Sequence, residues 1–443
     1  MEDAVAARLL ASINADRLVL LAGAGVSVSP PSRVPLAAPL ATYCSIEHTR
    51  ITNEVLPALV ATDLLTQTEF FKTRGQLASH FIAKLVPWPA FLRPPNRGHD
   101  AIADFLAAAV VDFVVTTNYD TLVESSAGQL GEPDFRPALD GEEANDASLS
   151  HRPYLKIHGC CSIDRKNTIW CPSQLPEAEI NRRIESAKLW LAGKLPGRDL
   201  VLLGFWSDWK YLNTVLERVV AGTVPASILV VDTATPADLE NRAPGLWAWA
   251  HNPGVHFTHV QQRASDFLDD LRARFSRILL EQILQSSLPT YIQLAGGPFP
   301  GALALPAHLS TDDLYSLRRS FSGSPANDVT RIKHPDVQMH IAGATHLLLL
   351  SGGAVLDGPF YVLNHETIRL VNGAGQVMSQ VRSRFAAEGG SAVSVDYVIC
   401  AGARDDGGVP TSVVRGAGPA SVVRAGHHDN WLTDEQARHD LGI

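Results

Sequence analysis

The sequence predicts an α/β fold built on a doubly wound parallel sheet with a helical insertion, followed by a smaller C-terminal α+β domain. Two observations lead to this prediction. Short, mostly apolar runs of strand length recur through the first 285 residues, and segments with helical periodicity lie between them. Runs that are apolar rather than alternating are typical of parallel strands covered on both faces. Strands that alternate with helices are typical of a doubly wound sheet.

The strands are expected where the apolar runs are clearest. These runs lie at residues 18–22, 112–116, 153–157, 199–204 and 227–231. Helical patterns predict helices at residues 4–15, 66–86, 99–109, 176–192, 211–220 and 264–285. The last of these is expected to close the domain by packing on the sheet. The long segment 45–98 is expected to be the helical insertion.

The length of the chain predicts more than one domain. A chain of 443 residues is too long for one ordinary core, and after residue 287 Pro and Gly become frequent between short apolar runs. We therefore expect a first domain over 1–287 and a second over 288–443. Strand candidates in the second are 346–350, 360–363, 368–371 and 395–400, with mobile loops at 405–408 and 411–426. The first candidate leads either into a ligand loop or into a structural turn.

Charge and cysteine usage narrow the classes of function. The net charge is -9 and no run of Lys or Arg is present, so nucleic acid is not indicated as a partner. The five cysteines contain no C-x-x-C pair, which excludes a four-cysteine zinc ribbon, and no metal is expected. An odd number of cysteines without a framework suits a reducing compartment. No apolar stretch reaches about 18 residues, so no membrane partner is expected and the cytoplasm is the expected location.

Polar or small residues follow each of the five predicted strands. In open α/β sheets, ligands bind outside the carboxyl ends of the strands, so these strand ends are expected to form one site. The residues concerned are Gly23-Ala24-Gly25-Val26-Ser27, Thr116-Thr117-Asn118-Tyr119-Asp120, His158-Gly159, Gly204-Phe205-Trp206-Ser207-Asp208 and Asp232.

The glycine-rich loop after the first strand has two interpretations. Gly23 and Gly25 can bring backbone N–H groups against a pyrophosphate, with Ser27 as an added hydroxyl donor. The same residues also suit a tight turn. The dehydrogenase pattern G-x-G-x-x-G is not met because Val28 occupies the third glycine position, which disfavours a hydride-transfer site.

The other strand ends carry the candidate catalytic groups. Asn118 lies where its amide can hold a ribose hydroxyl or a water, while Asp120 suits the N-cap of the following helix. His158 is a candidate general base, although most histidines in a protein are structural or exposed. Asp232 suits an adenosine ribose, and a turn-forming aspartate is the alternative.

As an ordered set, Gly23-Ala24-Gly25-Val26-Ser27, Thr117-Asn118-Tyr119-Asp120, Lys156-Ile157-His158-Gly159 and Gly204-Phe205-x-Ser207-Asp208 resemble the sirtuin superfamily. The order and spacing are most similar to its bacterial SIR2-like branch, which includes anti-phage defence proteins. The resemblance covers residues 15–285 and implies a Rossmann-like domain that binds NAD.

The resemblance also implies roles for single residues. Residues 23–27 (Gly23, Ala24, Gly25 and Ser27 among them) would cradle the pyrophosphate, and Thr117 and Asp120 belong to the cofactor-binding set. Asn118 would hold the nicotinamide ribose and position a water, with His158 as the base. Gly204, Ser207 and Asp232 would line the adenosine side.

Two departures from the deacetylating sirtuins indicate the reaction. This chain has no four-cysteine ribbon, and its loop 30–35 lacks the Asp-Phe-Arg that those enzymes carry. Both favour NAD+ glycohydrolase activity with water as acceptor. The alternatives are an NAD-dependent protein deacylase, an ADP-ribosyltransferase, or a non-catalytic sensor of NAD or ADP-ribose. Branch members without zinc are largely NAD-depleting defence effectors. We therefore expect a homo-oligomer, with an activating protein or small ligand acting on residues 288–443.

Overall fold

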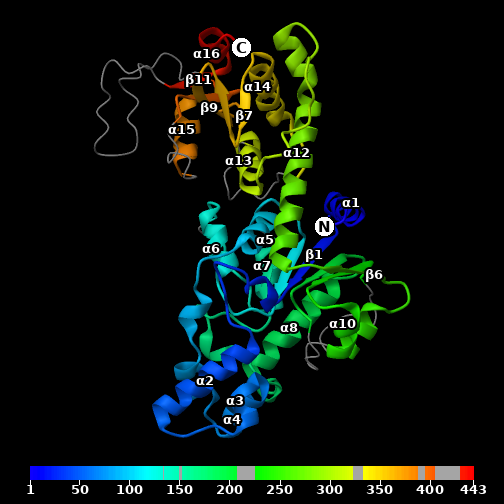
Figure 1. Ribbon diagram of the computed structural model, residues 1–443, viewed down its shortest axis with the longest axis vertical. Coiled ribbons are helices and arrows are strands. Elements are labelled where there is room, and N and C mark those ends of the chain that lie inside the picture. Colours follow the sequence, from blue (N-terminus) through cyan, green and yellow to red (C-terminus); the bar gives the residue numbers. More distant parts are fainter. Residues whose placement is uncertain (133, 149–151, 207–224, 323–332, 388–394, 405–429) are drawn as a thin grey trace. The chain divides into compact units, whose positions relative to one another are not determined.

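The computed structural model divides into two compact units, Met1–Asp269 and Asp270–Ile443 (Figure 1). It describes residues 1–132, 134–148, 152–206, 225–322, 333–387, 395–404 and 430–443. The boundary between the units along the chain falls within helix α12 (Ala264–Ala295). The domain boundary expected near residue 287 stays a prediction. In the described part of the chain, no helix is both long and apolar enough to cross a membrane.

The first unit contains a six-stranded sheet in the order β3-β2-β1-β4-β5-β6, with every neighbouring pair parallel. The strands are β1 (Leu18–Ala22), β2 (Phe113–Thr116), β3 (Tyr154–Lys156), β4 (Asp199–Leu203), β5 (Ser227–Asp232) and β6 (His256–Gln261). The predicted doubly wound sheet is confirmed. Its order reverses between β1 and β4, and this switch point is where such sheets bind ligands. The edge strand β6 carries no apolar run, which explains why the sequence pattern did not reveal it.

Helices cover this sheet, as expected from the alternating pattern. They are α1 (Asp3–Asn14), α5 (Arg97–Ala107), α6 (Leu122–Gln129), α7 (Gly141–Ala147), α8 (Ala178–Lys194), α10 (Pro236–Arg242) and α11 (Pro244–Ala250). The core on one face joins Val19, Phe113 and Leu202 of the strands to Trp190 of α8. The helix predicted at 211–220 lies outside the described residues.

The segment between β1 and α5 is the expected helical insertion. It contains α2 (Ala37–Thr52), α3 (Ala58–Thr62), α4 (Leu64–Thr73), the π-helix Leu77–Leu85 and a 3₁₀ turn Trp88–Phe91. The single helix predicted over 66–86 is wrong, because the chain turns at Gly75, whose φ of +67° favours glycine. Phe71, Phe81 and Trp88 form a separate core with Trp170 from the β3–β4 connection.

The second unit is the smaller α+β domain. Its sheet has the order β11-β10-β9-β8-β7, with β7, β8 and β9 antiparallel and β9, β10 and β11 parallel. The strands are β7 (Val355–Asp357), β8 (Phe360–Leu363), β9 (Glu366–Asn372), β10 (Tyr397–Ala401) and β11 (Trp431–Thr433). The helices are α13 (Thr311–Ser322), α14 (His340–Ser351), α15 (Met378–Ala387) and α16 (Asp434–Leu441).

One strand prediction for the second unit is wrong. Residues 346–350 belong to helix α14, in which every residue from Ala342 to Leu349 is buried. A helix that is apolar on all sides cannot be told from a buried strand by periodicity. The strands predicted at 360–363, 368–371 and 395–400 correspond to β8, β9 and β10. The loops expected at 405–408 and 411–426 lie outside the described residues.

Candidate active site

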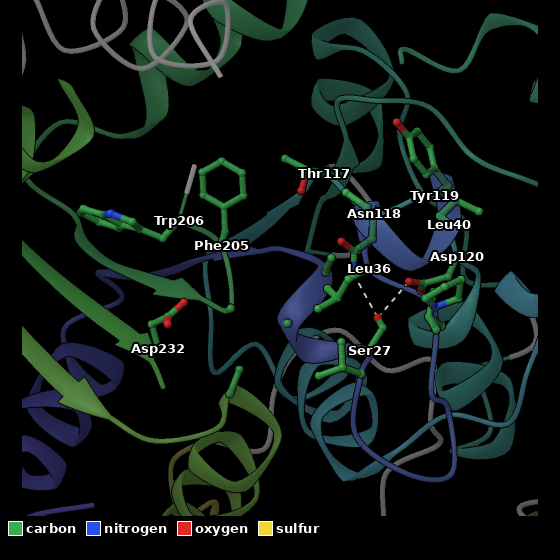
Figure 2. Close-up of a pocket in the computed structure, with 18 of the residues that line it drawn as sticks. Ser27, Leu36, Leu40, Thr117, Asn118, Tyr119, Asp120, Phe205, Trp206 and Asp232 are labelled. Carbon is green, nitrogen blue, oxygen red and sulfur yellow. Dashed lines mark hydrogen bonds between the residues drawn. The ribbon is translucent and has the colours of Figure 1, made fainter. Parts of the chain in front are cut away.

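A cavity of about 600 Å³ opens at the carboxyl edge of the first sheet, within the size range of ligand sites (Figure 2). All five predicted strand-end loops contribute to its lining. The predicted site residues among them are Ala24, Gly25, Ser27, Thr117, Asn118, Asp120, His158, Gly204 and Asp232. Gly23 lies directly beside this set but is not part of the lining, and Ser207 lies outside the described residues.

The glycines after β1 bring two backbones into contact. The N–H of Gly23 donates to Leu203 O at 2.9 Å, and the N–H of Gly25 donates to Gly204 O at 2.9 Å. A Cβ on Gly25 would lie 2.6 Å from Gly204 Cα, so neither glycine tolerates a side chain. Both N–H groups that the sequence suggested for a pyrophosphate therefore bond within the protein. Within loop 23–27, Ala24 is the one residue whose backbone N–H has no hydrogen-bond partner in the described part of the structure.

The Ser27 hydroxyl is the centre of a buried hydrogen-bond network. Ser27 Oγ donates to Asp120 Oδ2 at 2.9 Å and accepts from Asn118 Nδ2 at 3.1 Å. It also lies 3.0 Å from His99 Nε2. A hydroxyl has one proton and two lone pairs, so these contacts use Ser27 completely. Ser27 thus positions other side chains and has no proton left to donate to a ligand.

His99 is a site residue that the sequence analysis missed. The backbone N–H of Asn96 donates to His99 Nδ1 at 3.1 Å, which leaves the ring proton on Nε2 for donation to Ser27. Burial lowers the pKa of His99, so the ring is neutral at neutral pH. The available signal was Asn96, whose side chain caps α5 by accepting from Gly98 N at 2.9 Å. A capping asparagine fixes the first helical turn, and with it the direction of His99.

The side-chain amide of Asn118 is fixed through its nitrogen, and its oxygen remains available to a ligand. Its Nδ2 donates to Gly23 O at 3.2 Å as well as to Ser27 Oγ. Because both N–H donors of the amide bond within the protein, the oxygen is the group able to accept a hydrogen bond from a ribose hydroxyl or a water. Asp120 next to this loop also acts at the start of α6, where Oδ1 accepts from Leu122 N at 3.3 Å.

His158 lines the cavity and is neutral. Its side chain is buried, and burial lowers the pKa to about 3, while a hydrogen bond with the Thr117 backbone acts in the opposite direction. With a pKa of about 3 this imidazole is a weak base, which can take a proton only from a water made acidic by bonding to a cationic centre. It also avoids placing a second positive charge beside a cationic ligand, which would repel it.

Asp232, Phe205 and Trp206 lie on the other side of the cavity from Asn118 and Asp120 (Figure 2). Asp232 Oδ1 accepts from Ala234 N at 2.8 Å and lies 4.0 Å from Arg242 Nη1. The aspartate therefore forms the turn that the sequence suggested as an alternative, and it faces the cavity as well. Trp206 is fixed by donating from Nε1 to Leu239 O at 2.7 Å.

Part of the first unit is similar to a known protein family. Residues 112–248, which include Asn118, His158 and Asp232, match the model of a family described as SIR2-like domain. A mutant Sir2 homologue in complex with ADP-ribose is 16% identical, with a TM-score of 0.35, over 61% of this chain and 95% of its own. A Sir2 homologue in complex with NAD is 15% identical, with a TM-score of 0.32, over 60% of this chain and 91% of its own. A search of curated proteins finds no match.

The six-stranded parallel sheet, its switch point and the cavity beside it define a Rossmann-like ligand-binding domain. Within this domain, residues 112–248 are similar to the SIR2-like domain family.

Proposed function

We propose that this protein is an NAD+ glycohydrolase that converts NAD+ and water into ADP-ribose and nicotinamide. The observation that carries the proposal is the meeting of Asn118 and His158 in one cavity, from loops on neighbouring parallel strands. An amide oxygen and a neutral imidazole are the groups needed to hold and deprotonate a water. The cavity opens at the switch point, where a dinucleotide is expected to lie.

The reaction requires cleavage of the bond between ribose C1′ and the nicotinamide nitrogen. The bonding electron pair leaves with the nicotinamide, which becomes neutral, while the ribose approaches an oxocarbenium ion. A water that donates a hydrogen bond to the Asn118 oxygen adds to C1′, and His158 takes the proton that this water loses. Fixed dipoles stabilise the developing charge better than mobile water does, because they need no reorganisation. The buried network around Ser27 keeps the Asn118 amide fixed in this way.

The wall of the cavity supports water as the acceptor. The segment in the place of the deacetylase Asp-Phe-Arg is Pro30 to Pro35, and the part of it that reaches the cavity is apolar. The apolar lining from this segment and the insertion consists of Val34, Pro35, Leu36, Ala37, Ala38, Leu40 and Leu64. An apolar wall supplies no polar partner for a second substrate and excludes bulk water from the reacting bond.

In the cell, we propose that NAD+ depletion serves anti-phage defence in the cytoplasm. A constitutive NAD+ hydrolase would poison its host, so activity is proposed to depend on homo-oligomer assembly, or on a protein or small ligand that binds the second unit. NAD+ acts here as substrate, and the proposal involves no metal.

The proposal is tested by incubating the full chain with NAD+, with and without an acyl-lysine peptide, and separating the products by chromatography. Nicotinamide and free ADP-ribose without peptide are the expected products once the chain is assembled or activated. Nicotinamide released only with peptide would replace hydrolysis by deacylation. ADP-ribose attached to protein would replace it by ADP-ribosyl transfer. ADP-ribose binding in a calorimeter, with no nicotinamide released under any condition, would leave only a sensor.

A further inference from the structure

A lysine with no exposed surface ends strand β3, two residues before His158. Lys156 is 0% exposed, and a lysine is almost never fully buried unless it is paired. Its partner is Glu124 in the first turn of α6, whose Oε1 accepts from Lys156 Nζ at 2.7 Å. The same ammonium group also donates to the backbone carbonyl of Asp120.

These two contacts join the two loops that carry the candidate catalytic groups. Asp120 ends the loop that follows β2 and contains Asn118, while Lys156 leads directly into His158. Strands β2 and β3 are neighbours, with Thr116 paired to Lys156. Regular strand pairing ends at this point, and beyond it the loops are joined by single contacts, among them the hydrogen bond from Cys161 N to Tyr119 O at 2.9 Å and the one between His158 and the Thr117 backbone. Lys156 provides such a contact from one loop to the other.

The pair is poorly suited to serve stability alone. Removing two charges from water costs several kcal/mol per ion, and apolar residues of similar volume are often as stable or more stable. Glu124 Oε2 is buried without a hydrogen-bond partner in the described part of the chain, which adds to the cost. A buried pair kept at such a cost, between two loops of one cavity, is best explained by what it positions.

We infer that Lys156 is a positioning residue that fixes the Asn118 loop relative to His158. The inference rests on the proposed hydrolysis of NAD+, since both side chains must act on one ribose. A displacement of about 1 Å between reacting groups can cost on the order of a hundredfold in rate. Lys156 therefore acts on turnover without touching the substrate.

The experiment separates positioning from stability with a paired substitution. Lys156→Met alone leaves the largely buried Glu124 carboxylate with only the Cys160 thiol, at 3.9 Å, as a partner, so it is expected to lower the melting temperature. Lys156→Met combined with Glu124→Leu removes both charges and is expected to recover most of the melting temperature. If Lys156 positions the loops, the double variant still loses on the order of a hundredfold in kcat for NAD+, while KM and the affinity for ADP-ribose change little.

A control variant and a second readout complete the test. Arg182 bonds to the buried Asp140 at 2.9 Å outside the cavity lining, so Arg182→Met is expected to lower the melting temperature and leave kcat unchanged. Selective isotope labelling of asparagine and histidine is expected to show displaced Asn118 and His158 signals in the double variant. Unchanged signals, or full kcat in the double variant, overturn the inference. Absence of nicotinamide from the wild-type reaction under every activating condition overturns the proposed hydrolysis instead, and the signals still decide the role of Lys156.

Discussion

The buried Ser27 hydroxyl donates its one proton to Asp120 Oδ2 at 2.9 Å, between two loops that line the cavity. Both residues belong to the predicted cofactor-binding set, yet their polar atoms bond to each other. The contact ties the loop after β1 to the loop after β2. Asn118 lies on the second loop and donates to the same hydroxyl. Ser27 and Asp120 therefore affect a bound ligand indirectly, because they fix the position of Asn118.

Removal of this hydroxyl is expected to destabilise the first unit. Ser27→Ala leaves Asp120 Oδ2, Asn118 Nδ2 and His99 Nε2 without a shared partner. Each buried polar group left unpaired costs about 1–3 kcal/mol, so the unfolding free energy is expected to fall by at least that amount in urea titrations. Ser29→Ala is the matched control, because its hydroxyl bonds to Ser265 in a half-buried position and a smaller loss is expected. Equal losses in the two variants would contradict the central role of Ser27.

Substitution of either candidate catalytic group is expected to abolish most turnover. His158→Ala removes the proposed base and Asn118→Ala removes the group proposed to orient the water, so each is expected to reduce NAD+ hydrolysis on the order of a hundredfold or more. The reaction is followed by nicotinamide release. Melting temperatures of both variants must be measured alongside, since Asn118 also bonds to Gly23 and Ser27. Full turnover in the activated variant that carries both His158→Ala and Asn118→Ala would show that this cavity is not the active site.

The charge of Asp232 is expected to discriminate against a phosphate on the adenosine ribose. An acidic residue at the end of a strand suits a ribose 2′-hydroxyl, whereas the 2′-phosphate of NADP+ would face a like charge. Asp232→Asn is expected to raise the ratio of kcat/KM for NADP+ to that for NAD+ by roughly tenfold, about 1.4 kcal/mol. The Ala234 N–H can still bond to the asparagine oxygen, so the turn is retained. An unchanged ratio would place the adenosine ribose elsewhere in the cavity.

Acid is expected to destabilise both units through two buried histidines. Burial lowers the pKa of His158 and of His346 from the usual 6.5 to about 3. Below pH 6.5 the unfolded chain binds protons that the folded chain excludes, so the unfolding free energy falls as the pH drops toward 3. Above pH 6.5 these groups have no effect. Each histidine contributes a slope of up to about 1.4 kcal/mol per pH unit.

Single substitutions assign this slope to its residues. His346 Nδ1 lies 2.7 Å from the Tyr361 hydroxyl in the second unit, and His346→Gln is expected to flatten the pH dependence of that unit. The exposed His439 offers a control, since His439→Gln changes no buried group. Chemical denaturation at a series of pH values measures the slope. A slope that persists in both His158→Gln and His346→Gln would assign acid sensitivity to other groups.

The sequence pattern revealed the parts of the fold that depend on local periodicity. The five buried strands agree with their predicted positions to within about a residue, because each is an apolar run between turn residues. The end of the helix before Gly75 could not be predicted, because the residues on both sides of this glycine continue the helical pattern. Helix α14 was missed because its burial on all sides erases the period.

For the site, the sequence indicated which loops meet but could not show how their atoms pair. Placement at strand ends was sufficient to select Asn118, His158 and Asp232. Gly23, Gly25 and Ser27 bond within the protein because Leu203, Gly204 and Asp120, which lie far away in the chain, accept their hydrogen bonds. His99 was missed for the same reason, since its partner Ser27 is 72 residues away.

The cavity is assembled from two separately packed bodies of side chains. The polar groups come from loops of the sheet, while Leu36, Leu40 and Leu64 come from the insertion, which has its own core around Phe71 and Phe81. Size and chemistry can therefore be altered independently. Exchange of a leucine in the wall for a smaller residue would enlarge the cavity, and the hydrogen bonds of Asn118 would stay as they are. If the proposed hydrolysis is correct, such a variant would cleave a bulkier synthetic dinucleotide in addition to NAD+.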